Sequence, residues 1–185
     1  TTANGVVHRI PGVLFAQNFE TLGPGICRNT QLSLFCALIA RADVGQPSDS
    51  SRIDALLRNE AVDVTVFVPN NAAMTAAVEI LNGAPLPSGV TAAQYIQNTL
   101  PVATARRIAQ FHILPVRAYS VNLPLVSTNM PTLLGSSPGL LVDRSTALPR
   151  LSGPSNNGSF ANFLGTDREA TNGTWHEIDR VLLPQ

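Results

Sequence analysis

The 185-residue chain contains no lysine, so all twelve of its basic residues are arginine. This absence excludes enzymes that need an amine on a flexible stem, such as pyridoxal-dependent Schiff-base enzymes and P-loop NTPases. Charge is also sparse, because charged residues make up 13% of the chain and twelve acidic residues balance the basic ones. We therefore expect neither nucleic acid nor an acidic membrane surface among its partners.

Long hydrophobic runs are missing as well. The uncharged run over residues 32–40 is far shorter than the roughly 20 residues that span a bilayer, and the N-terminus lacks the charged-then-apolar pattern of a signal peptide. The 44% of hydrophobic residues suffices for one sizeable core. These features predict a soluble, already processed chain with one main domain and no transmembrane segment.

Only two cysteines are present, Cys27 and Cys36. A zinc site needs three or four protein ligands, and no further His or Cys stands nearby at ligand spacing, so we expect no metal. A local disulfide and two unrelated thiols both remain possible, and we favour the disulfide. Two N-x-Ser/Thr sequons, at Asn157 and Asn172, predict glycosylation on a secretory route, with Asn157 preferred because the Asn-Gly pair at Asn172 also suits a tight turn.

Hydrophobic periodicity divides the chain into a helical first part and a strand-rich second part. Apolar residues at helical spacing predict a helix that begins at Asn29 or Thr30, and the same spacing recurs in four further segments. These segments are 52–60, 72–81, 91–100 and 103–114. Residues 62–68 alternate as a strand with its valines on one face, and short β-type runs follow Pro115. This segregation predicts an α+β fold rather than a parallel α/β fold.

Three motifs carry a more specific signal, and they are TVFVPNNAAM (65–74), RRIAQFHIL (106–114) and NGTWHEIDRVLLP (172–184). In order and spacing they resemble the first conserved box, the central His motif and the second conserved box of the fasciclin-like (FAS1) domain family. The resemblance covers about residues 18–185. It implies a wedge-shaped β-sandwich of mainly antiparallel strands with helices packed over one side, in secreted or cell-surface proteins.

The opening of the chain repeats its end. Residues 4–17 match residues 172–185 at seven of fourteen positions. Residues 1–17 are therefore interpreted either as the tail of a preceding FAS1-like domain in a tandem array or as a leading strand of a single domain, with the FAS1 domain over 18–185. In the final box we expect four side chains to enter the core, namely Ile178, Val181, Leu182 and Leu183.

Catalytic patterns are scarce. The three histidines, His8, His112 and His176, are spread along the chain, and there is no G-x-S-x-G nucleophile motif. We expect no enzyme, and we expect the rings of His112 and His176 to bond to backbone groups within their boxes. Phe111-His112 stands where adhesive members of the family are credited with a Tyr-His motif, and the chain has no Arg-Gly-Asp, so integrin recognition of the animal type is not expected.

The resemblance predicts an extracellular adhesion or matrix module without a required cofactor. Its partners would be matrix or cell-surface proteins or glycans, or another FAS1 domain. The alternative is a soluble extracellular carrier of a lipophilic ligand, such as a carotenoid of the astaxanthin type, as in the green-algal FAS1 relatives that the chain also resembles. Five side chains are candidates for the apolar tunnel of such a carrier: Met74, Val78, Leu81, Phe111 and Ile113.

Overall fold

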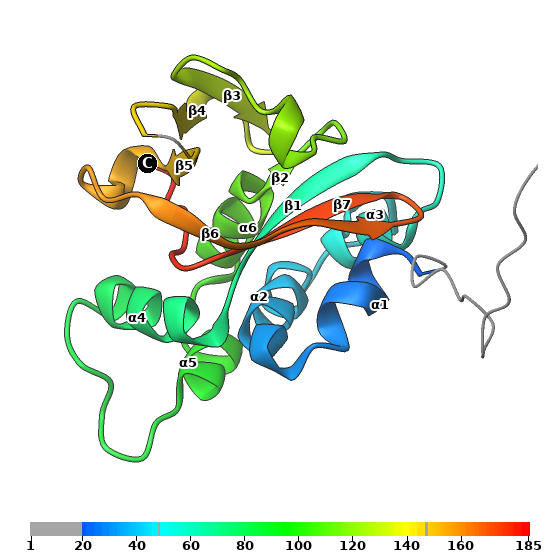
Figure 1. Ribbon diagram of the computed structural model, residues 1–185. Helices are drawn as coiled ribbons and strands as arrows, with labels where there is room; N and C mark the ends of the chain where they lie inside the picture. Colours follow the sequence, from blue (N-terminus) through cyan, green and yellow to red (C-terminus); the bar gives the residue numbers. More distant parts are fainter. Residues whose placement is uncertain (1–19, 48, 147) are drawn as a thin grey trace, which may run out of the picture.

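The computed structural model describes residues 20–47, 49–146 and 148–185 (Figure 1). The helices are α1 (Leu22–Cys27), α2 (Ser33–Ala42), α3 (Ile53–Arg58), α4 (Asn71–Asn82), α5 (Ala92–Asn98) and α6 (Val102–Phe111). The strands are β1 (Val64–Pro69), β2 (Ile113–Leu114), β3 (Thr128–Thr132), β4 (Gly135–Asp143), β5 (Arg150–Ser152), β6 (Ala161–Ala170) and β7 (Gly173–Ile178). Short 3-10 turns lie at Thr30–Leu32, Asp49–Ser51, Ser120–Asn122 and Pro154–Asn156. The predicted leading segment, residues 1–17, lies outside the described residues.

The strands run in the order β2-β1-β7-β6-β5-β4-β3. Every neighbouring pair is antiparallel except β1 and β7, which are parallel. The prediction of a mainly antiparallel α+β fold is therefore confirmed. The short β5–β6 pairing joins the two halves of the expected sandwich into one continuous order of strands.

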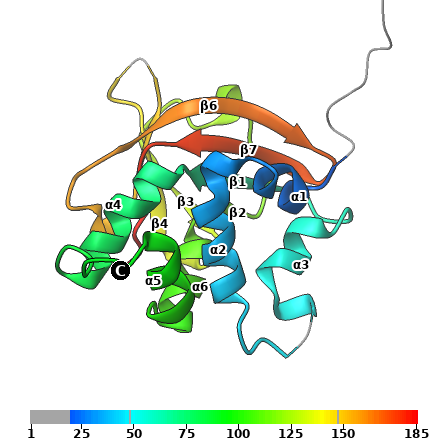
Figure 2. The same ribbon diagram turned by 90° about the horizontal axis from the view of Figure 1, so that it is seen from below.

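The six α-helices gather on one side of β6 and β7 (Figure 2). Their apolar faces share one core cluster with valines of β1, while a second cluster lies around Phe67, Phe111 and Leu140. Strand β1 is consequently buried on both faces, and the predicted alternation is confirmed, because Val64, Val66 and Val68 lie in the first cluster and Phe67 lies in the second. The buried Thr65 hydroxyl donates to the carbonyl of Val116 and accepts from the N–H of Ala118, both at 2.7 Å.

Helix ends follow local sequence signals. Asn70 caps α4 by accepting the N–H of Ala73, and Gly83 ends the helix with a positive φ of 74°. Thr91 and Gln94 form a capping box at the start of α5. The helix predicted over 103–114 ends at Phe111, because residues 113 and 114 pair with β1 as β2.

Gly173 begins β7 at a point where two backbones nearly touch. Its φ is +153°, and a Cβ placed there would lie 2.0 Å from the carbonyl oxygen of Val64 and 2.8 Å from Cδ1 of Leu22. Both atoms belong to buried residues. Only glycine therefore allows β7 to start against β1 at this register.

The substitution Gly173→Ala should destabilise the domain by about 3 kcal/mol or more, because backbone and a packed leucine must both move. Gly158→Ala is the matched control, since Gly158 has a φ of +75° and no atom within 4 Å of an added Cβ. Its cost should be about 1 kcal/mol, from backbone conformation alone. Urea unfolding of the two variants checks the difference, and an equal loss in both would contradict the close-approach argument.

Candidate functional site

The first and last sequence motifs become neighbours in the sheet. Strands β1 and β7 pair in parallel from Val64 opposite Gly173 to Pro69 opposite Ile178. The N–H of Asn70 then donates to the carbonyl of Ile178. Residues 181–183, which follow β7, are buried with Ile178, as the sequence predicted. The two boxes therefore form the centre of the domain rather than a surface.

The central histidine, His112, is fully buried at the C-terminal end of α6. Its Nδ1–H donates to the carbonyl of Ile108 at 2.8 Å, and its Nε2 accepts the N–H of Leu182 at 3.0 Å. Burial lowers the pKa of His112 to about 4, although the hydrogen bond to Ile108 acts in the opposite direction. The ring is therefore neutral and joins α6 to the segment after β7.

The second buried histidine, His176, lies in β7 between aromatic rings. Its Nε2–H donates to the carbonyl of Ala118 at 2.9 Å, and its Nδ1 accepts the N–H of Asp167 at 3.1 Å. The ring stacks on Phe67 and meets the edge of Phe163. Burial lowers the pKa of His176, and its hydrogen bond to the carbonyl of Ala118 and the negative charge of the Asp167 carboxylate only partly offset this effect.

Ser120, Asp167 and His176 lie together, but their bonds do not form a catalytic triad. The Ser120 hydroxyl and N–H both donate to the carboxylate of Asp167. Partial burial acts to raise the pKa of Asp167, and the bonds from Ser120 outweigh it, so this pKa is lowered. Both nitrogens of His176 are already bonded to backbone, so no imidazole nitrogen is free to take a proton from Ser120.

The two sequons differ sharply in their surroundings. Asn172 is 1% exposed; its Nδ2 donates to the carbonyls of Leu57 and Asn59, and its Oδ1 accepts the N–H of Leu22. A glycan on that nitrogen is incompatible with this geometry, so the prediction of a glycan at Asn172 does not fit the folded domain. Asn157 is exposed in a turn with a φ of +50°.

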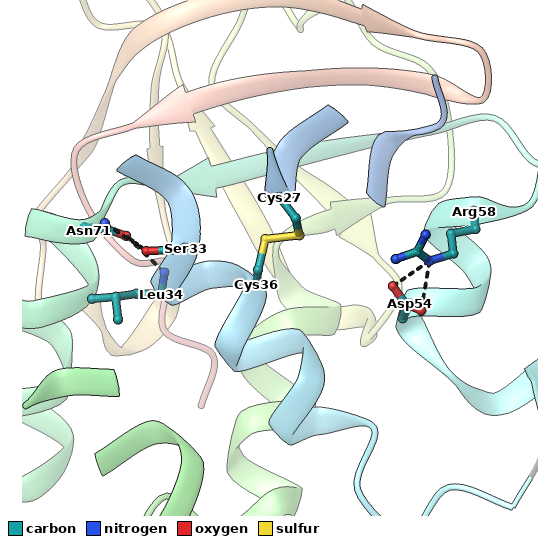
Figure 3. Close-up of a disulfide and its surroundings, with 7 residues drawn as sticks. All are labelled: Cys27, Ser33, Leu34, Cys36, Asp54, Arg58 and Asn71. Atoms are coloured by element: carbon teal, nitrogen blue, oxygen red, sulfur yellow. Dashed lines mark hydrogen bonds and ion pairs between the residues drawn. A yellow bond between two sulfur atoms is a disulfide. The ribbon is translucent and has the colours of Figure 1, made fainter. Parts of the chain in front are cut away.

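The two cysteines form a disulfide that ties the end of α1 to α2 (Figure 3). Beside it, Asn71 joins the start of α4 to the start of α2, because its Oδ1 accepts the N–H of Leu34 and its Nδ2 donates to the carbonyl of Thr30. The disulfide thus links α1 to α2, and Asn71 links α2 to α4. Among the described residues, no group of three or more His, Cys, Asp or Glu side chains lies close enough to hold a metal ion.

The five residues predicted to line a ligand tunnel do not come together around one space. Met74, Val78 and Ile113 pack in the core cluster with the helices, whereas Phe111 packs in the other cluster. Leu81 is half-buried and lines a surface hollow beside α4 and α6. Four of the five side chains therefore fill the core.

A larger surface hollow lies in a different region, which the sequence analysis did not single out. We call it the β6 hollow; it has a volume of about 890 Å³ and lies between residues 163–166 of β6, residues 120–121, and residues 144, 146 and 148–150. Three exposed aliphatic side chains line it, Val121, Leu148 and Leu164, with exposed fractions of 83%, 77% and 54%. Leu125 and Val126, also exposed, follow in the same loop.

Two arginines and no acidic side chain line the β6 hollow. Arg150 is engaged, because it bonds to the carboxylate of Asp143 at 2.6 Å and its guanidinium lies 4.2 Å from the centre of the Phe160 ring. Arg150, followed by Ser145, lowers the pKa of Asp143 to about 2. Within the described part of the chain, the guanidinium of Arg144 has no acidic partner.

The three sequence motifs thus lie mainly in the interior of the domain, whereas the β6 hollow lies on its surface. A family model of the Fasciclin domain matches residues 31–184, and the chain belongs to this family, which is associated with cell adhesion and consists generally of non-catalytic modules. No curated protein sequence matches the chain.

Among solved structures, the chain is similar to the FAS1 domain pair of the insect cell adhesion molecule fasciclin I. The TM-score is 0.53 at 20% sequence identity, and the match covers 84% of this chain. It covers 46% of the insect chain, so this protein spans about half the length of that domain pair. The likeness confirms the FAS1 fold.

The buried His112 makes stability depend on pH in a defined window. The unfolded chain binds a proton near pH 6.5, whereas the folded domain resists it down to a pKa of about 4. Stability is therefore full above pH 6.5 and falls by about 3 kcal/mol as the pH drops to 4. Urea unfolding across this window should show a shallower pH dependence in His112→Asn, with the remaining slope due partly to His176. A variant as steep as the wild type would contradict this assignment.

Secretion from a eukaryotic host should add a glycan at Asn157 and none at Asn172, because the folded domain uses both Nδ2 hydrogens of Asn172. Intact mass spectrometry checks the number of glycans. Asn157→Gln should remove the added mass and leave folding unchanged. A folded protein that carries a glycan on Asn172 would disprove the structural role of this side chain.

Proposed function

We propose that this FAS1 domain acts outside the cell as an adhesion or matrix module that binds protein partners and has no catalytic activity. The observation that carries the proposal is the exposed aliphatic surface around the β6 hollow. Val121, Leu148 and Leu164 line this hollow, are each more than half exposed and come from three separate segments of the chain. Apolar side chains gathered on a surface favour a protein-binding role.

The interior supports a binding role rather than a chemical one. Both buried histidines use their ring nitrogens in bonds to backbone groups, and the Ser120 hydroxyl is bonded to Asp167. A nucleophile needs an adjacent free base, which this arrangement does not offer. The polar groups that sequence motifs bring together therefore serve the fold.

An extracellular location is supported by the Cys27–Cys36 disulfide, since such bonds persist in oxidising compartments. Exposed Asn157 offers a sequon in keeping with secretion. The described residues include no helix long and apolar enough to cross a membrane. The partners would be matrix or cell-surface proteins, including a further FAS1 domain. A glycan partner is less favoured, because among the described residues just one arginine of the hollow, Arg144, lacks an acidic partner.

The alternative of a carotenoid or other lipophilic carrier lacks a supporting observation of this kind. Its candidate residues Met74, Val78, Phe111 and Ile113 are 3% exposed or less and pack against core neighbours. A tunnel at these positions would require the core to open. Adhesion is therefore the function that the exposed surface favours.

Beads coated with the domain should attach to matrix-bearing cells of the source organism several-fold more than albumin-coated beads. Leu148→Asp should reduce this attachment, because it places a charge in the aliphatic surface. Ile80→Asp is the matched control, since Ile80 is 61% exposed but lies on α4, away from the β6 hollow. Clumping of coated beads without cells would identify a second copy of this domain as the partner. Attachment no greater than with albumin would disprove the adhesive role.

A further inference from the structure

The β6 hollow contains an open strand edge. Strand β5 pairs with β6 only through Arg150 opposite Asn162 and Leu151 opposite Ala161. Strand β6 continues to Ala170, and no described strand lies on this side of it beyond Asn162. Residues 163–166 of β6 line the hollow instead. Backbone groups of an unpaired strand edge favour pairing with another chain.

Pro149 explains why the pairing stops. Continuing the register of Arg150 and Asn162 would place Pro149 opposite Phe163, and proline has no N–H to donate. The backbone of Asn162 is used on the other side, because its N–H donates to the Asp179 carboxylate and its carbonyl accepts the N–H of Asp179. Successive residues of a strand bond to opposite sides, so the backbone groups of Phe163 point into the hollow.

The far end of this edge is closed. Asp167 has a positive φ of 58°, which interrupts the strand geometry, and its carboxylate accepts two bonds from Ser120. The open edge therefore covers residues 163–166, roughly 13 Å of strand. That length fits four or five extended residues. A helix, about 10 Å wide and with its backbone groups already bonded internally, could not satisfy the edge.

We propose that the β6 hollow docks a short extended segment of a partner protein, which adds a strand along residues 163–166 and places an acidic side chain on Arg144. This inference rests on the proposed adhesive function and names its partner class. Main-chain hydrogen bonds to β6 would hold the segment, as in other cases of strand addition. Apolar side chains on alternate residues would contact Leu148, Leu164 and Val121.

The charge of the hollow selects the chemistry of the segment. Of the two arginines that line the hollow, Arg144 has no acidic partner among the described residues, whereas Arg150 is already bonded to Asp143. An Asp or Glu in the segment would meet Arg144 with no acidic lining side chain to repel it. A basic segment would be repelled by both arginines. Electrostatic complementarity of this kind contributes specificity more than affinity.

A phage-displayed library of random heptapeptides, selected on the immobilised domain, tests the proposal. The wild type should enrich peptides with alternating apolar residues and one Asp or Glu. Arg144→Gln should lose the acidic preference, with affinity for the selected peptides reduced about 3- to 10-fold. Leu164→Asp should abolish enrichment, while Ile80→Asp, a matched exposed aliphatic on another face, should enrich the same peptides as the wild type.

Hydrogen exchange then locates the bound peptide. Backbone amides of residues 163–166 should become protected, and a peptide N-methylated at alternate amides should lose binding. The proposal is overturned if no peptides are enriched, if Leu164→Asp enriches them equally, or if no protection appears in β6. Beads coated with Arg144→Gln or Leu164→Asp could still adhere although these variants enrich no peptides. That result would retain the adhesive function and reject strand docking. If beads coated with the wild-type domain do not adhere, the proposed function is rejected.

Discussion

The parallel pairing of β1 and β7 is the contact on which the rest of the domain depends. It joins Val64 near the middle of the chain to Gly173 near its end, and the close backbone approach at Gly173 sets the register. Next to it, the buried Asn172 bonds to the backbone of the first residue of α1 and to the backbone at the end of α3, at Leu57 and Asn59. The helices and the two core clusters are assembled around this pair, so a small error at its start would propagate to both sides of the sheet.

Local signals predicted α4 and α5 well, because the starts of both helices and the end of α4 are set by their own residues, whereas α1 was not predicted. Asn70 and Gly83 bound α4, and Thr91 with Gln94 begins α5, just where capping chemistry places them. The alternation in residues 62–68 correctly put the valines of β1 on one face, but it did not predict the burial of the opposite face, because Thr65 and Phe67 take their surroundings from residues 111–118 and β7. Alternation in one strand does not report which distant segments cover its two faces.

The candidate site was likewise predictable from the sequence only in part. The structural role expected for His112 and His176 agrees with their backbone bonds, since each box places its histidine among apolar neighbours. Patterns of apolar residues mark the core, and for that reason the five proposed tunnel residues proved to be mainly core. The β6 hollow had no such pattern, because Val121, Leu148 and Leu164 stand in or beside polar, proline-containing loops. The one signal available in the sequence was the presence of these three aliphatic residues in otherwise polar segments, which indicates exposed apolar side chains.

In this domain the interactions that stabilise the fold and the surface proposed to bind a partner lie in different parts of the sheet. The two buried histidines, His112 and His176, use both ring nitrogens in bonds to backbone groups, so freeing either ring for chemistry would cost stability. At the β5–β6 junction the sheet depends on only two residue pairs, and Pro149 prevents a third. The same proline that limits internal pairing leaves the edge of β6 facing the hollow. There Arg144 has no acidic partner among the described residues. A surface built from an interruption of the sheet can change its partner through loop residues while the β1–β7 pair stays intact.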